Sequence, residues 1–306
     1  MSRLRLPLVI CVCCLFWAAL GAALGAIFHH ALGGLILGLL FGIGYVVFGS
    51  WAAEKFPLDV WDANLLENVH APKLYEMIQA LCERVGMETP ILYYSTRSEP
   101  NAYVIERREG DPVIVVTNGL TRHLDKDEVQ AVMALMIARL ATGAMPTWTV
   151  TSTLAGLPLQ LGLSLRRLKL DGLGNALLLV FAYPAAALAR LGWDVKVVTA
   201  ADHHAVHLAE MPGALGSALI KIEAGQSEDV AWAGNPATAM LFAAPPLPAP
   251  PSDAPTWRRV LSLFPSFGPD VAARTARLPS SAAGPSTRRP SESSEDATRH
   301  IMDPRN

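Results

Sequence analysis

The chain has 306 residues, a formal net charge of -2 and four cysteines, of which three lie in the first apolar run and Cys82 stands alone. Only 17% of the residues are charged and the mean hydropathy is +0.30, a balance that indicates a membrane protein and argues against nucleic-acid binding. No disulfide framework is expected from these cysteines, so a reducing compartment is favoured.

Residues 1–53 predict a transmembrane helical hairpin. Two uncharged runs, residues 6–28 and 33–53, each approach the roughly 20 residues that a bilayer requires. A cleaved signal peptide is the alternative for the first run, but a second span after so short a joint favours the hairpin. Arginines before the first run place the N-terminus in the cytoplasm and return the chain there afterwards. Glycines such as Gly34 and Gly38 suit close packing of the two helices.

Residues 54–145 have the pattern of a soluble α/β unit. Pro72 and Gly86 bracket a helix over residues 73–85, because proline suits the first turn and glycine the position after the end. Three short strands are expected at residues 89–96, 101–106 and 112–117. Asn118 and Gly119 are then expected to turn the chain toward the next helix.

A helix is predicted to begin at Asp125. Asp125 and Glu128 have the spacing of a capping box, in which each side chain accepts a free backbone N–H of the first turn. Apolar residues then repeat at helical spacing as far as Leu140, which predicts one buried face. Leu135 and Arg139 lie four residues apart and therefore share a face of this helix.

The motifs around this helix resemble those of the HtpX-type membrane zinc metallopeptidases, which have a Ste/HtpX-like peptidase domain. The resemblance rests on their order along the chain: Asn68-Val-His-Ala-Pro, Glu99-Pro-Asn-Ala-Tyr, Val115-x-Thr-x-Gly-Leu, Leu124-Asp-x-Asp-Glu-Val and Asn235-Pro-Ala-Thr-Ala. It covers residues 1–278. It implies a mainly α, α+β zincin-like peptidase domain with a small β-sheet over residues 54–278, and a second membrane hairpin inserted at residues 147–192.

The inserted hairpin has two competing interpretations from its residues. Its first run carries several hydroxyls and Pro158, and its second contains Asn175, Pro184 and Arg190. If both runs span the bilayer, the basic joint at residues 166–169 falls on the outer side, against the positive-inside tendency. A buried helical pair and a shallow re-entrant hairpin are the alternatives.

The resemblance implies a His-Glu-x-x-His zinc motif at positions that hold Leu135, Met136 and Arg139 in this chain. Val198 stands where the family has its third ligand, a Glu, while Asp202 keeps the family's Asp. Leucine and valine have no lone pair, arginine is a permanent cation that only donates, and a methionine thioether cannot take a proton from water. We therefore expect no zinc and no other cofactor. Arg139 is expected to pair with an acid such as Asp202 or to reach solvent.

His203 and His207 are the weaker candidates for a relocated metal site. They are one helical turn apart, but they lie about 100° around the helix from residues 198 and 202 and should not face the same cleft. Solvated or hydrogen-bonded histidines are the simpler interpretation.

The C-terminal part changes in composition. Residues 243–256 are rich in proline and predict an extended linker. Residues 279–306 contain few apolar residues and predict a disordered tail, because such a segment cannot bury enough surface to offset its loss of entropy.

Together these patterns predict a multi-pass inner-membrane protein whose peptidase-like domain faces the cytoplasm. We expect a pseudopeptidase that sits in the lipid bilayer and binds or scaffolds membrane proteins or peptides. Two alternatives stay open: an active zinc metalloendopeptidase in protein quality control, and a structural membrane subunit whose cleft has no role.

Overall fold

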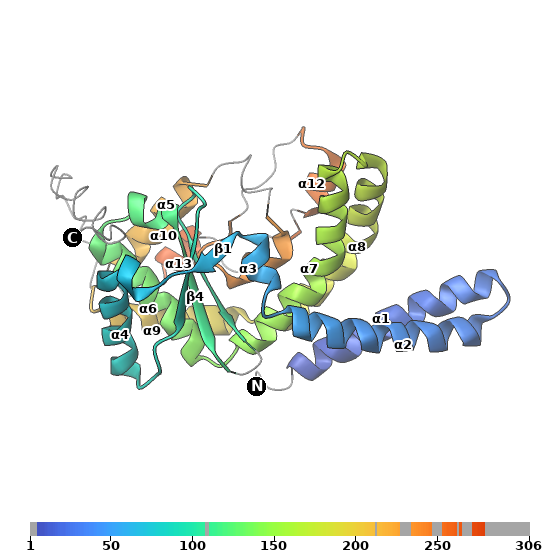
Figure 1. Ribbon diagram of the computed structural model, residues 1–306, viewed down its shortest axis with the longest axis horizontal. Helices are drawn as coiled ribbons and strands as arrows, with labels where there is room; N and C mark the ends of the chain where they lie inside the picture. The colour runs from blue at the N-terminus through green and yellow to red at the C-terminus, as the bar shows by residue number, and fades with distance from the viewer. Residues whose placement is uncertain are drawn as a thin grey trace.

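The computed structural model describes residues 5–107, 110–211, 213–226, 234–246, 253–261, 263–264 and 271–278 (Figure 1). Its first half contains α1 (Arg5–Ile27), α2 (Ala31–Ala52), α3 (Phe56–Val60), β1 (Ala63–Leu65), η2 (Asn68–His70), α4 (Pro72–Val85), β2 (Ile91–Ser95), β3 (Ala102–Glu106) and β4 (Pro112–Thr117). The second half contains α5 (Asn118–His123), α6 (Lys126–Ala141), α7 (Met145–Arg167), α8 (Asp171–Gly192), α9 (Val195–Ala209), α10 (Ala214–Ala224), η3 (Pro236–Leu241), α12 (Thr256–Leu261) and α13 (Val271–Thr275). The predicted tail at residues 279–306 and residues 247–252 of the linker lie outside the described residues.

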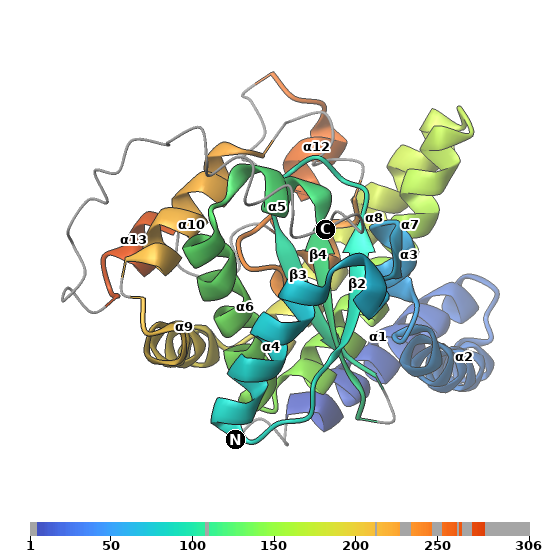
Figure 2. The same cartoon turned by 60° about the vertical axis from the view of Figure 1, so that its left-hand side comes forward.

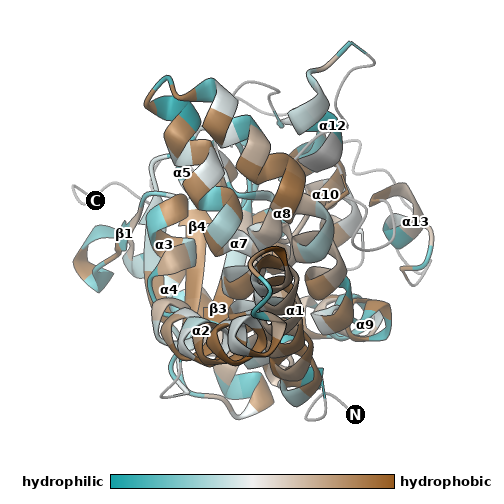
Figure 3. Cartoon of the chain, turned by 90° about the vertical axis from the view of Figure 1, so that its right-hand side faces the viewer, coloured by the Kyte–Doolittle hydropathy of each residue, from teal (hydrophilic) through white to brown (hydrophobic). Residues whose placement is uncertain are grey.

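The mainly helical α+β fold class is confirmed, and so is the N-terminal hairpin. The helices α1 and α2 pack along each other and are apolar on all sides (Figure 3). Their contact depends on glycine, because a Cβ on Gly34 would collide with the backbone of Gly21, whereas one on Gly33 would meet nothing. Most other side chains of the hairpin are exposed, as expected of helices that face lipid.

The sheet has four strands in the order β1-β2-β4-β3. The central strands β2 and β4 are parallel, with Tyr93 opposite Val115, and the outer strands β1 and β3 are antiparallel to their neighbours. The predicted strands are confirmed to within two residues. The three-residue β1 was not predicted, because so short a strand has no detectable alternation and depends on a partner far along the chain.

Helix α6 lies at the centre of the domain. It packs against β3, α4, α9 and α10, and Figure 2 shows α4 and α6 side by side against the sheet. From Glu128 to Leu140 every side chain except that of Gln130 is buried. The expectation of one buried face was therefore too narrow, because helices cover α6 on the sides that the sheet leaves open.

Two short helices were not predicted. Residues 118–123 form α5, where a turn was expected, and Thr117 caps this helix by accepting the N–H of Leu120. Gly119 is required there, since a Cβ would collide with the carbonyl group of Ser98. Helix α3 directly follows the membrane hairpin and leads the chain into β1.

The helices α7 and α8 form the second hairpin, which runs in a different direction from α1–α2 (Figures 1 and 3). Helix α6 meets α7 at a bend of 93°, and the first half of α7 is buried against β3 and η3. Two of its buried hydroxyls are satisfied locally, as Thr149 and Thr153 donate to carbonyls one turn back, whereas the buried hydroxyl of Thr151 has no hydrogen-bond partner among the described residues. Among the described helices α1, α2 and α8 are each long and apolar enough to cross a bilayer. Insertion of the whole α7–α8 pair stays a prediction.

Candidate functional site

The start of α6 is fixed by the predicted capping box. Asp125 accepts the N–H of Glu128 at 2.9 Å, and Glu128 accepts the N–H of Asp125 at 3.0 Å. Glu128 is only 3% exposed and also accepts the hydroxyl of Ser217 and the ammonium of Lys221, the latter at 2.7 Å. The first turn of α6 is therefore bound to α10, which holds the rest of the helix in register with its neighbours.

The predicted site positions are all buried and lie on two helices that pack against each other, α6 and α9. Leu135 and Met136 are fully buried, and Val198 and Arg139 are 2% and 1% exposed. Three of these four side chains are apolar, and the charged one is the guanidinium of Arg139.

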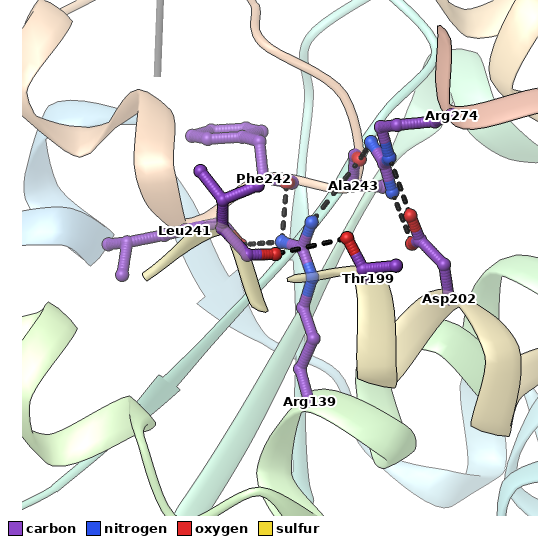
Figure 4. Close-up of polar contacts among 8 residues, drawn as sticks. Arg139, Thr199, Asp202, Leu241, Phe242, Ala243 and Arg274 are labelled. Atoms are coloured by element: carbon purple, nitrogen blue, oxygen red, sulfur yellow. Dashed lines mark hydrogen bonds and ion pairs between the residues drawn. The ribbon is translucent and has the colours of Figure 1, made fainter. Parts of the chain in front are cut away.

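Arg139 neither pairs with Asp202 nor reaches solvent, so both expectations for it were wrong. Its guanidinium donates to the carbonyl oxygens of three consecutive residues at 3.4, 2.5 and 3.4 Å, namely Leu241, Phe242 and Ala243 (Figure 4). Its Nε has no hydrogen-bond partner among the described residues. The side chain stays inside because this turn of backbone supplies several acceptors within its reach.

Asp202 is unavailable to Arg139 because Arg274 of α13 holds it. The guanidinium of Arg274 donates to both carboxylate oxygens of Asp202 at 2.9 and 2.6 Å, and both side chains are buried (Figure 4). Arg274 also donates to the carbonyl of Ala243 at 2.6 Å, so the two arginines share this acceptor. Sequence reasoning missed Arg274, because nothing in the local pattern links α13 to a residue 72 positions earlier.

The buried cluster has two guanidinium groups and one carboxylate. Burial lowers the pKa of Arg139 to about 9, and the nearby charge of Arg274 acts in the same direction, while Asp202 opposes both. At neutral pH Arg139 is therefore still a cation. With two guanidinium groups against one carboxylate the cluster has a net positive charge, which disfavours a further cation such as a metal ion.

The segment that Arg139 holds also covers the outer edge of the sheet. Phe242 forms an antiparallel bridge with Tyr103 of β3, and the N–H of Ala243 donates to the carbonyl of Ala102 at 2.8 Å. Asn101 donates to the carbonyl of Ala244 at 2.9 Å. An exposed strand edge is where an extended peptide would add to a sheet. In this chain residues 242–244 occupy the start of that edge.

The donors in this region do not fit a zinc ion. Zinc in proteins takes Cys, His and carboxylate ligands, and the carboxylate that the described residues place beside Arg139 and Arg274 is that of Asp202, which the two-point contact with Arg274 occupies. His203 and His207 are exposed on α9, whereas Val198 and Asp202 are buried on its other side, as their spacing predicted. Within the part of the chain that the structure describes, no three His, Cys, Asp or Glu side chains come close enough to hold a metal.

The chain matches the family model described as Peptidase family M48 over residues 68–281. Two similar proteins are each named Protease HtpX homolog. The one from Thermococcus kodakarensis is 28% identical, over 68% of this chain and 82% of its own length. The one from Thermococcus sibiricus is 29% identical, over 68% of this chain and 76% of its own. Among solved structures, that of S. mikatae Ste24p superposes with a TM-score of 0.41 at 16% identity, covering 85% of this chain and 61% of that one.

Proposed function

Since the chain belongs to peptidase family M48, we propose that it is a membrane-anchored pseudopeptidase: a member that keeps the peptidase fold and lacks the zinc chemistry. In this proposal Leu135, Met136, Arg139 and Val198 stand at the positions of the zinc ligands and the catalytic base. The chain then acts by binding other membrane proteins or peptides.

The observation that carries the proposal is the environment of Arg139. A catalytic zinc needs three lone-pair donors and an open position for water. Arg139 has only N–H donors, is 1% exposed, and directs them at three backbone carbonyls. The side chain thus has a structural role that a metal ligand at the same position could not fulfil.

The remaining positions support the same conclusion. Hydrolysis at a zinc centre requires a group that accepts a proton from the attacking water. Met136 offers a thioether, and it is fully buried. Asp202 is the nearest carboxylate on α9, but its two oxygens are held by Arg274. No hydrolytic step can be assigned to these residues.

A cleavage assay tests the proposal. The full chain, purified in mild detergent, is incubated with fluorescent casein and with a membrane-protein substrate, with and without the zinc chelator 1,10-phenanthroline. We expect cleavage at the background level in all four conditions. Cleavage that the chelator abolishes would contradict the proposal and would establish the alternative, an active zinc metalloendopeptidase in protein quality control.

We also place the peptidase-like domain on the cytoplasmic side of a multi-pass inner-membrane protein. Arg5, at the start of α1, donates to Asp194, the residue before α9, at 2.7 Å. The N-terminal end of α1 and the domain therefore share one side of the bilayer, and basic residues at that end favour the cytoplasm. Proteolysis of intact spheroplasts tests this orientation, because a cytoplasmic domain stays protected until the membrane is opened.

A photo-crosslinking experiment separates partner binding from a purely structural role. Gln226 lines a small pocket beside Phe242 and Asn101, whereas Gln79 is exposed on α4 away from it. A photoreactive amino acid at Gln226 is expected to give a discrete cross-linked partner band, and the same amino acid at Gln79 is the matched control. Equal cross-linking from both positions would favour the structural subunit.

A further inference from the structure

A cavity of about 190 Å³ lies where the two helical hairpins meet. Its walls come from α1, α2, α7 and α8, three of which are long and apolar enough to cross a bilayer. The side chains that form most of its surface are apolar or aromatic: Val12, Phe16, Trp17, Phe181, Pro184 and Leu188. None of the residues that line the cavity lies on α6.

The cavity exists because the helices around it cannot close. The α1–α2 and α7–α8 hairpins run in different directions (Figures 1 and 3), so the helices of one hairpin pack against those of the other over only part of their length. Pro158 and Pro184 line the cavity and remove a backbone hydrogen bond from α7 and α8 respectively. The rings of Trp17 and Phe181 lie 5.8 Å apart at a tilt rather than stacked.

Water is a poor occupant of this space. A buried water needs two to four polar partners, and an apolar cavity of roughly 150 Å³ in other proteins stays dry and takes up small hydrocarbons. The hydroxyl of Tyr45, a polar group in the wall, already donates to the carbonyl of Leu154 at 2.5 Å. The cavity therefore favours a hydrocarbon ligand.

The surroundings identify that ligand. Leu15, Leu161 and Tyr183, on the helices that form the walls, are 66%, 56% and 62% exposed, so these helices present large apolar side chains on their outer surfaces, as expected where helices face lipid. In the interior of a bilayer, the molecules that surround such helices are the acyl chains of lipids. We propose that the cavity binds an acyl chain of a membrane phospholipid, which fills the junction of the two hairpins and holds them together.

The cavity is small compared with a phospholipid. The cavity holds part of an acyl chain rather than a whole lipid, and none of the described residues that line it is charged. Selectivity is therefore expected to depend on chain length and unsaturation and to be independent of the headgroup.

Photolabelling tests the proposal. The full chain is reconstituted in phosphatidylethanolamine and phosphatidylglycerol vesicles that contain a phosphatidylcholine with a diazirine in one acyl chain, and labelled peptides are mapped by mass spectrometry. Labelling of α8 around Leu188 should saturate with probe concentration. Labelling of the exposed α2 residues Leu37 and Leu40, which contact bulk lipid, should rise in proportion to it.

Two substitutions give the matched comparison. Ala185→Phe puts a ring into the cavity, while Ala176→Phe makes the same change on the exposed side of the same helix. If the ring in the first variant displaces as few as two methylene groups of the bound acyl chain, the saturable labelling should fall roughly tenfold. In the second variant the saturable labelling should stay unchanged. Ala187→Phe, at the exposed rim, is expected to act like Ala185→Phe and replaces it if that variant does not fold.

The proposal is overturned if labelling near Leu188 fails to saturate, or if it is unaffected by both cavity substitutions. It is also overturned if the cavity residues cross-link to another protein in native membranes in place of the lipid probe. The outcome is independent of zinc content and cleavage, so it stands or falls separately from the function proposed above.

Discussion

Replacing Asp202 by Asn should destabilise the domain far more than an ordinary loss of one charge. Among the described residues Asp202 is the only carboxylate that touches Arg274, and Arg274 shares the carbonyl of Ala243 with Arg139. The substitution leaves two buried guanidinium groups with no counter-charge. Breaking one partner of a buried ion pair costs about 3–5 kcal/mol. For a chain of this size we expect Tm to fall by roughly 6–20 °C, at about 2–4 °C per kcal/mol.

The assay is thermal unfolding of the detergent-solubilised protein, followed by the fluorescence of buried tryptophans such as Trp61 and Trp148. Asp194→Asn is the matched control. Asp194 also forms an ion pair, with Arg5, but the two side chains are 22% and 33% exposed, and asparagine caps α9 as well as aspartate does. The control should therefore cost less than about 1 kcal/mol.

The reasoning is refuted if the two substitutions lower Tm by the same amount. A second comparison uses Arg139→Met in the Asp202→Asn background. Because the methionine removes one of two uncompensated cations, it should cost less there than in the wild-type chain, or should raise Tm. Additive effects of the two changes would show that Arg139 and Asp202 do not belong to one electrostatic cluster.

Three further predictions concern other parts of the chain. In the folded protein Arg139 loses its proton near pH 9, whereas in the unfolded chain it keeps the proton. The free energy of unfolding of the wild-type chain, compared with that of Arg139→Met, should therefore rise as the pH increases above about 9. Denaturant titrations of both proteins at several pH values measure this difference. Gly34→Ala should destabilise the protein by about 1–3 kcal/mol through collision with α1, while Gly33→Ala, with open space around it, should have little effect on Tm. Glu128→Gln should destabilise the protein by about 1–3 kcal/mol, because the buried Glu128 loses its charged contact to the partly exposed Lys221, and a double-mutant cycle with Lys221→Met should show that the two residues are coupled.

Local patterns in the sequence were sufficient to predict most of the elements. The capping box at Asp125 and Glu128 marks the start of α6, and Gly86 ends α4 in a left-handed conformation with φ of 67°. Both signals act within one or two helical turns, so a single stretch of sequence contains all of the information. The two uncharged runs of the first hairpin are equally local.

The contacts of the site could not be predicted in the same way. Arg139 binds backbone carbonyls about 100 residues further on, and any residue carries a carbonyl, so no side-chain pattern marks its partner. Asp202 was assigned to the wrong arginine for a related reason, since α13 reaches it only in the folded chain. The direction of α7–α8 relative to α1–α2 likewise depends on packing around the sheet rather than on the hydropathy of either hairpin.

Zinc content is the most direct test of a pseudopeptidase. The wild-type chain is purified in the presence of zinc, dialysed, and measured by inductively coupled plasma mass spectrometry. A variant with Leu135→His, Met136→Glu, Arg139→His and Val198→Glu, which restores the proposed donors, is measured beside it. The account predicts zinc near the background level in the wild-type chain and retention by the restored variant. One equivalent of zinc retained by the wild-type chain would contradict it.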